Sequence, residues 1–145
     1  MAAEAAALII KPAIAFGLII GAYEAILLHR DVSVPAHRFG HTLHALGFAL
    51  LFTFITMNTE WFLSVVPAIA SIPLLGNVHV LRVAVGLIAI LKIHGASAAI
   101  QGSSGGSSVG LAEKWSHSLV VGALIVGAPY LYPLIQDMLP AFLRG

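Results

Sequence analysis

The chain has 145 residues, of which 59% are hydrophobic and 9% are charged, and its mean hydropathy is +0.99. Since soluble globular domains contain about 25% charged residues, this composition predicts an integral membrane protein. The net charge of +1 without a run of Lys or Arg excludes a nucleic-acid-binding surface and a polybasic lipid-binding tail, and the absence of cysteine excludes disulfides, thiolate catalysis and cysteine metal centres.

The first apolar segment, residues 5–28, is long enough to cross a bilayer, which requires about 20 apolar residues. Lys11 and Pro12 interrupt it, and because proline is tolerated in the first turn of a helix, we expect the regular span to begin near Pro12. A cleaved secretory signal would start with positive charge and have an apolar core of about 7–15 residues. Here Glu4 is the first charged residue and the apolar stretch is longer, so the sequence predicts a retained membrane helix.

The same length criterion predicts three further spans, at about residues 39–57, 78–100 and 113–135. The segment at about 62–76 is also apolar, but Pro67 and Pro73 break it and it is too short to span alone. It is therefore predicted to be an interfacial or re-entrant segment. The Gly/Ser-rich residues 101–110 are predicted to be a flexible connector.

These segments predict an all-α integral membrane protein. Residues 1–145 form one domain, with about four transmembrane helices in an up-and-down bundle surrounded by the lipid bilayer. The Lys and Arg residues divide almost evenly between the two sides, so the positive-inside rule favours neither orientation of this multi-pass chain. Gly17 and Gly21 form a G-x-x-x-G motif, which predicts close helix packing within one chain or between copies.

Four ionisable side chains fall at one depth when the predicted spans are folded up and down. At a rise of about 1.5 Å per residue, each lies roughly 6–9 Å inside the end of its span, on the same side of the membrane. They are Glu24, His44, His94 and His117, one from each span. Because ionisable groups in a membrane are costly and normally face the interior of a bundle, we expect these side chains to point inward and converge on a polar site.

Helical spacing extends this set. His37, His41 and His44 follow the i, i+4, i+7 pattern, and Glu113 lies four residues before His117, so each group shares a helix face if the helices extend that far. The candidate residues for an ion, proton, metal or haem site are therefore Glu24, His37, His41, His44, His94, Glu113 and His117. The alternative is hydrogen bonding between helices without further function. Lys92, two residues before His94, is predicted to point to roughly the opposite face of the span, so one of the two must face away from the site, for which a subunit interface is one option.

A second, smaller polar network is predicted at the other side of the membrane. Its members are Lys11, Glu60, His79 and Arg82. His79 and Arg82 are three residues apart on one helix face, which permits Arg82 to pair with Glu60. Because all four lie at span ends near solvent, we interpret this network as structural.

Three functions fit this pattern. The leading hypothesis is a non-enzymatic transporter or channel for protons or a metal ion, which with only four short spans would require a homo-oligomer. One alternative is a redox membrane subunit that holds haem b between two histidines, and another is an accessory subunit packed against partners in a larger membrane complex. The His and Glu side chains suit a divalent metal such as zinc by ligand type. No nucleophile and base pair is evident, so no catalytic residue is predicted.

Overall fold

The computed structural model describes the backbone of residues 6–31, 35–103 and 114–144, and their side chains except those of residues 28, 30, 31, 35–41 and 96–103. Four long helices dominate this part of the chain: α1 (Ile10–Asp31), α2 (Pro35–Met57), α5 (Val78–Ser103) and α6 (Trp115–Ile135). Four short helices accompany them: α3 (Thr59–Val65), α4 (Pro67–Ala70), η1 (Gln136–Met138) and η2 (Ala141–Leu143). The described residues contain no β-strand, so the predicted all-α class is confirmed for them.

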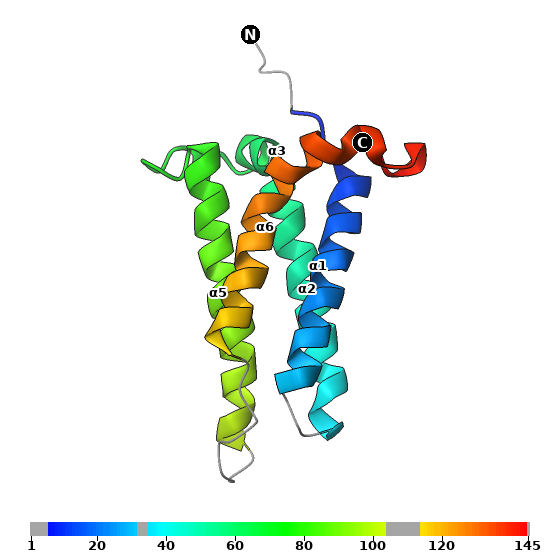
Figure 1. Ribbon diagram of the computed structural model, residues 1–145. Coiled ribbons are helices and arrows are strands. Elements are labelled where there is room, and N and C mark those ends of the chain that lie inside the picture. The colour runs from blue at the N-terminus through cyan, green and yellow to red at the C-terminus, as the bar shows by residue number, and fades with distance from the viewer. Residues whose placement is uncertain (1–5, 32–34, 104–113, 145) are drawn as a thin grey trace.

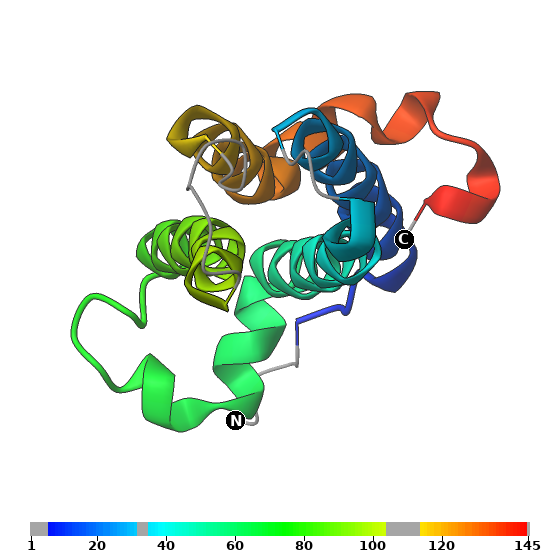
Figure 2. The ribbon, with the colours of Figure 1, turned by 90° about the horizontal axis from the view of Figure 1, so that it is seen from below.

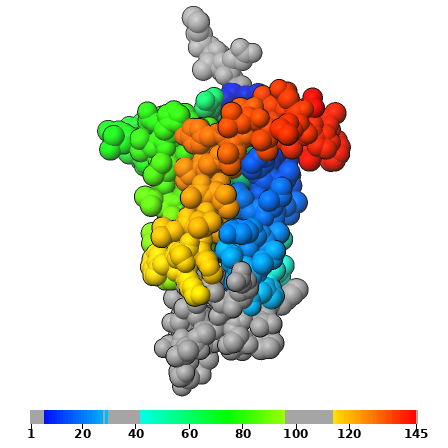
Figure 3. All heavy atoms as spheres, in the orientation of Figure 1, coloured from blue at the N-terminus to red at the C-terminus, as the bar shows by residue number. Residues whose placement is uncertain are grey.

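The long helices lie side by side, and consecutive ones run in opposite directions (Figure 1). Viewed end-on, they surround a common core in the order α1, α2, α5, α6 (Figure 2). Contacts also join α2 to α6 across the group, whereas no contact joins α1 to α5 in the described part of the chain. The C-terminal segment turns over the end of the group and touches α1 through η2 (Figure 3). Fully buried core positions include Ala13, Ala49, Ala89, Val121 and Ile125.

Three helices are long and apolar enough to cross a membrane, within the ranges Ile10–Leu27, Val78–Gly95 and Trp115–Met138. The remaining long helix qualifies only together with α3, which is bent from it by 83°, so the described chain offers three such segments or up to four. Large apolar side chains are exposed on every long helix, for example Ile19, Leu51, Leu87 and Leu119. An apolar outer surface of this extent is typical of contact with lipid, and the helices are compatible with the predicted multi-pass membrane protein.

The chain between α2 and α5 does not form a span of its own. The helices α3 and α4 have seven and four residues, far fewer than the roughly 20 needed to cross a bilayer. Pro67 occupies the first turn of α4, where its missing N–H costs no helical hydrogen bond. Leu74 then adopts a positive φ of 75° in the turn that leads back to α5. The predicted break in this segment is confirmed, and its interfacial or re-entrant position stays a prediction.

The glycine motif of α1 packs within the chain. A Cβ atom added at Gly17 would lie 2.9 Å from the Cα of Leu50, and one at Gly21 would lie 3.0 Å from the Cα of Leu46. Both distances are shorter than an ordinary carbon contact, so only glycine lets α1 and α2 approach this closely. The sequence left open whether this motif joins helices of one chain or of two, and the structure assigns it to the α1–α2 contact.

Asn58 ties the segment before α1 to the end of α2. Its side chain is 3% exposed; Oδ1 accepts the backbone N–H of Ile9 at 2.6 Å, and Nδ2 donates to the carbonyl oxygens of Ile9 and Phe54 at 3.1 and 2.9 Å. Through these three hydrogen bonds, one buried amide fixes the bend between α2 and α3 against the residues that precede α1.

We expect Asn58→Ala to lower the free energy of unfolding by about 2 kcal/mol, because a net hydrogen bond contributes about 0.5–1.5 kcal/mol and the Ile9 amide loses its partner. Asn77→Ala is the matched control, since Asn77 is exposed and its Oδ1 only caps α5 by accepting the N–H groups of His79 and Val80. Loss of such a cap costs about 1 kcal/mol. Unfolding in mixed detergent micelles, followed by circular dichroism, measures both; an equal loss in the two variants would contradict the role assigned to Asn58.

Candidate functional site

Glu24 lies in the interior of the four-helix group. Its side chain is 1% exposed, although it is a carboxyl on a helix whose neighbours are almost all apolar. The contact between Gly21 and Leu46 sets the register of α1 against α2. Because Glu24 follows Gly21 by three residues and the helices are antiparallel, it lies level with residues 42–45 of α2.

His94, on α5, lies at the contact between α5 and α6 near the start of α6. The ring of His94 stacks on that of Trp115, with centroids 3.7 Å apart and planes inclined by 25°. His94 and His117 are both half-buried. Gly95, the neighbour of His94, lines the same groove as His44. His94 on α5 and His44 on α2 therefore lie at similar heights along the helix axes. Together with the register of α1 against α2, these contacts put the four predicted residues within about one helical turn of the same depth.

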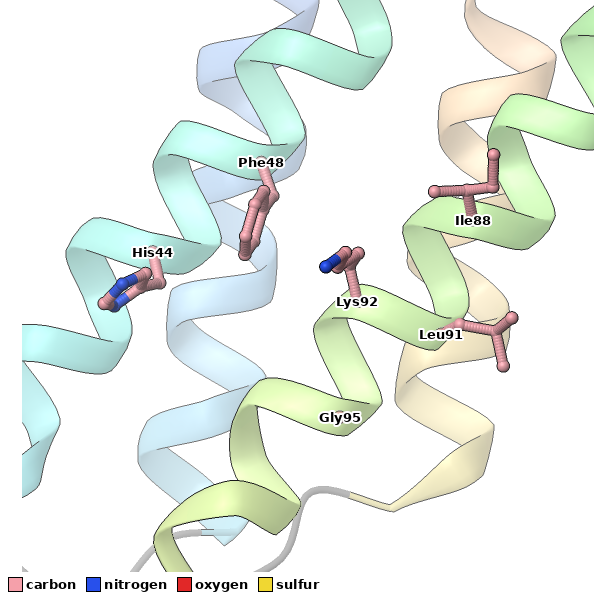
Figure 4. Close-up of a pocket in the computed structure, with 6 residues that line it drawn as sticks. All are labelled: His44, Phe48, Ile88, Leu91, Lys92 and Gly95. Carbon is pink, nitrogen blue, oxygen red and sulfur yellow. The ribbon is translucent and has the colours of Figure 1, made fainter.

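His44 does not point into the interior as the sequence predicted. It is exposed and lines a groove between α2 and α5 with Phe48 and Lys92 (Figure 4). The reason is the phase of α2: Ala45 and Ala49 occupy its buried face, so the residue before Ala45 is rotated about 100° away from that face. Lys92 and His94 were predicted to point to opposite faces of α5. In the described structure Lys92 faces this groove, while His94 faces Trp115.

The other candidates lie outside the side chains that the structure describes. His37 and His41 belong to the first turns of α2, where the backbone alone is described, and Glu113 precedes the described start of α6. Among the described side chains, no group of three or more His, Asp and Glu residues is placed to hold a metal ion. The predicted divalent metal therefore has no ligand set in this part of the chain.

Buried hydroxyl groups extend through the interior, and the sequence did not single them out. Ser118 on α6 and Thr53 on α2 are both 0% exposed, and their hydroxyl oxygens have no hydrogen-bond partner among the described atoms. Thr56, one turn beyond Thr53, is also fully buried and donates to the carbonyl oxygen of Ile125 at 2.9 Å. A pattern of Ser and Thr in apolar helices could have found them, but the sequence reasoning considered only ionisable residues.

The second polar network forms at the opposite end of the helices, with different partners from those predicted. Arg82 Nε donates to the carbonyl oxygen of Thr56 at 3.1 Å, and its guanidinium lies 5.0 Å from the centre of the Tyr130 ring. His79 Nδ1 lies 2.7 Å from the hydroxyl of the same tyrosine. The expected Arg82–Glu60 ion pair is not formed among the described residues, because the carbonyl and the aromatic ring take the guanidinium instead.

A pocket of about 260 Å³ opens beside this network. Arg82 and Glu60 line it from two sides, together with the Asn58 side chain and the segment before α1. Lys11, the fourth predicted member, is exposed and does not line the pocket. The pocket thus brings a cation and a carboxyl to the end of the interior that lies farthest from Glu24.

No family model, curated protein or solved structure matches the chain. Function is therefore inferred from residues and geometry. Three features bear on it: a buried carboxyl, two half-buried histidines at its depth, and buried hydroxyl groups between that level and a polar pocket at the other end.

Proposed function

We propose that the four long helices cross the membrane as an up-and-down bundle and that the protein conducts protons through its interior by way of Glu24. The observation that carries this proposal is the burial of Glu24, which is 1% exposed and is the one carboxyl among the buried side chains that the structure describes. A charged side chain inside a membrane helix is costly, with a maximum of about 2.5–3.5 kcal/mol at the helix centre on insertion scales. A carboxyl that can be neutral or charged at such a place is a natural carrier of a proton.

The hydroxyl groups supply the rest of the route. From the polar pocket, Arg82 reaches the carbonyl of Thr56, and Thr53 lies one turn deeper on the same helix. Contacts of α6 with α5 place Ser118 about level with residues 45–47 of α2, so roughly 10 Å separates it from Thr53 along the axis. Water molecules that enter the bundle would have to bridge this interval, with the two unpartnered hydroxyls as their protein partners.

The histidines serve the end of the route that is nearest Glu24. His94 and His117 are half-buried at the depth of the carboxyl, where they can exchange protons both with the interior and with the nearby solution. One imidazole nitrogen can accept a proton while the other releases one, which makes histidine suitable for this exchange. The route therefore runs from the pocket at Arg82, past the buried hydroxyls, to Glu24 and these two imidazoles.

Reconstitution into vesicles tests the proposal. With a pH-sensitive dye inside and a potential imposed by a potassium gradient and valinomycin, the protein should raise the rate of internal acidification well above that of protein-free vesicles. Equal rates would overturn the proposal. The same vesicles loaded with a zinc-sensitive dye test the metal-ion form of the hypothesis, in which zinc uptake would exceed that of protein-free vesicles.

The other sequence hypotheses receive no specific support from the geometry. A haem held by two histidines would need two imidazoles that face one another, whereas His44 lines the outer α2–α5 groove and His94 is stacked on Trp115. Assembly into a homo-oligomer or a larger membrane complex stays a prediction. Sedimentation of the purified protein in detergent measures that assembly directly.

A further inference from the structure

A groove of about 570 Å³ lies between α2 and α5, on the outside of the helix group. It is lined by His44, Phe48, Ile88, Leu91, Lys92 and Gly95 (Figure 4). Its volume falls within the range of about 300–1,000 Å³ that is typical of small-molecule sites. The proton route described above does not use it, because that route follows the interior.

The polar residues of the lining lie towards one end of the groove, next to Leu91, and the other end is lined by apolar residues. On α5, Ile88 lies nearer the middle of the helix, while Lys92 and Gly95 lie nearer its C-terminal end. On the antiparallel α2, Phe48 lies nearer the middle and His44 nearer the N-terminal end. On both helices, therefore, the polar side chain lies nearer the same end of the helix group. Figure 4 shows the apolar side chains of Phe48 and Ile88 on the upper part of the groove walls. This is the polarity of a lipid molecule in the adjacent leaflet.

Charge and space at the polar end favour an anion. Among the described side chains that line the groove, Lys92 supplies a cationic ammonium and none supplies a carboxylate. Figure 4 shows the Lys92 side chain on the side of α5 that is turned towards α2. A Cβ atom added at Gly95 would meet no atom within 4 Å, so the space beside Lys92 is open.

The depth of Lys92 suits a lipid headgroup. Lys92 is 14 residues, or about 21 Å, from the start of α5 at Val78, so with α5 entering the membrane at Val78 it would lie about 9 Å from the far edge of a hydrocarbon layer of about 30 Å. The long alkyl stem of lysine lets the ammonium reach several ångströms further towards the nearer interface. A second copy of the chain fits less well, because the described exposed carboxyls, Glu60 and Asp137, lie at the opposite end of the long helices.

We propose that this groove binds an anionic phospholipid. Its phosphate lies against the Lys92 ammonium beside His44 and Gly95, and one acyl chain lies along Phe48 and Ile88. The proposal rests on the membrane placement given under the proposed function but is independent of proton conduction.

Lipid retention measured by native mass spectrometry tests the site. Protein purified in detergent is titrated with phosphatidylglycerol or phosphatidylcholine of identical acyl chains, and the wild type should retain the anionic lipid several-fold more strongly. Lys92→Gln should reduce this preference about fivefold, the factor expected for one lysine near an anionic membrane surface. Lys92→Arg should preserve it, which guards against a loss caused by misfolding.

Lys114→Gln is the matched control. Lys114 is exposed at the same end of the helices, immediately before α6, but does not line the groove, so its loss should leave the preference unchanged. Equal loss in the two glutamine variants would show a general surface effect and overturn the site. A dimeric wild type and a monomeric Lys92→Gln variant would assign the groove to a second copy of the chain. That result would also overturn the proposed lipid site.

Failure of this proposal is distinguishable from failure of proton conduction. Glu24→Gln is expected to retain the anionic lipid as the wild type does, because Glu24 is buried in the interior and does not line the groove. A protein that binds the lipid but moves no protons would overturn only the proposed conduction.

Discussion

Glu24→Gln is expected to lower proton flux into reconstituted vesicles to the rate of protein-free vesicles. Glutamine has nearly the same shape and can still form hydrogen bonds, but its amide cannot gain and lose a proton as a carboxyl does. Since Glu24 is the only carboxyl buried among the described residues, no described acidic group can replace it at this depth. The measurement is the rate of internal acidification under an imposed potential, normalised to the amount of protein incorporated.

Two further variants separate chemistry from structure in this experiment. Glu24→Asp keeps a titratable carboxyl and should retain part of the flux, although its side chain is shorter by one methylene. Asp137→Asn removes a carboxyl that is exposed in η1, far from the interior, and should leave the flux at the wild-type rate. Wild-type flux in Glu24→Gln, with helical content unchanged by circular dichroism, would contradict the role of the carboxyl.

Gly17→Leu is expected to lower the free energy of unfolding by about 3 kcal/mol. The cost of overpacking a closely packed site is typically about 1–3 kcal/mol. The upper part of that range applies because the nearest atom to an added Cβ is the Cα of Leu50, at 2.9 Å, and backbone cannot rotate aside as a side chain can. The two helices would have to separate, and α1–α2 is the most extensive helix contact in the structure.

Gly47→Leu is the control for this substitution. Gly47 lies on α2, is exposed, and would place its Cβ in open space with no atom within 4 Å. Because leucine favours a helix over glycine by close to 1 kcal/mol, this variant should be as stable as the wild type or slightly more stable. Unfolding in mixed micelles, followed by circular dichroism and tryptophan fluorescence, compares the two; similar stability of both variants would show that the glycine of α1 is not required for packing.

Most of the fold follows from the sequence because span length and apolar composition are local properties. The predicted spans at about 39–57, 78–100 and 113–135 each correspond to a helix, with bounds that differ by a few residues. The helix predicted from about Pro12 begins at Ile10. Proline and short length likewise predicted the break between the second and third spans. The sequence did not predict that α2 begins at Pro35 or that α3 continues from it after a bend of 83°.

The site was only partly predictable, because depth follows from counting residues but direction does not. A rise of about 1.5 Å per residue was enough to place Glu24, His44, His94 and His117 at one level. Whether each points inward depends on which face of its helix packs against the others. Ala45 and Ala49 supply that face on α2, so His44 turns outward, while Glu24 turns inward with Ile20.

The sequence by itself predicted the all-α class and helices long and apolar enough to cross a membrane, because both depend on composition and on spacing along one chain. The tertiary structure alone decided which partners the ionisable side chains meet. It joined Arg82 to the Thr56 carbonyl and Tyr130 instead of Glu60, stacked His94 on Trp115, and separated an interior that contains Glu24 from an outer groove that contains Lys92. The physical reason is that helix rotation is set by close packing of small residues such as Gly17 and Gly21, and that contact involves two helices at once.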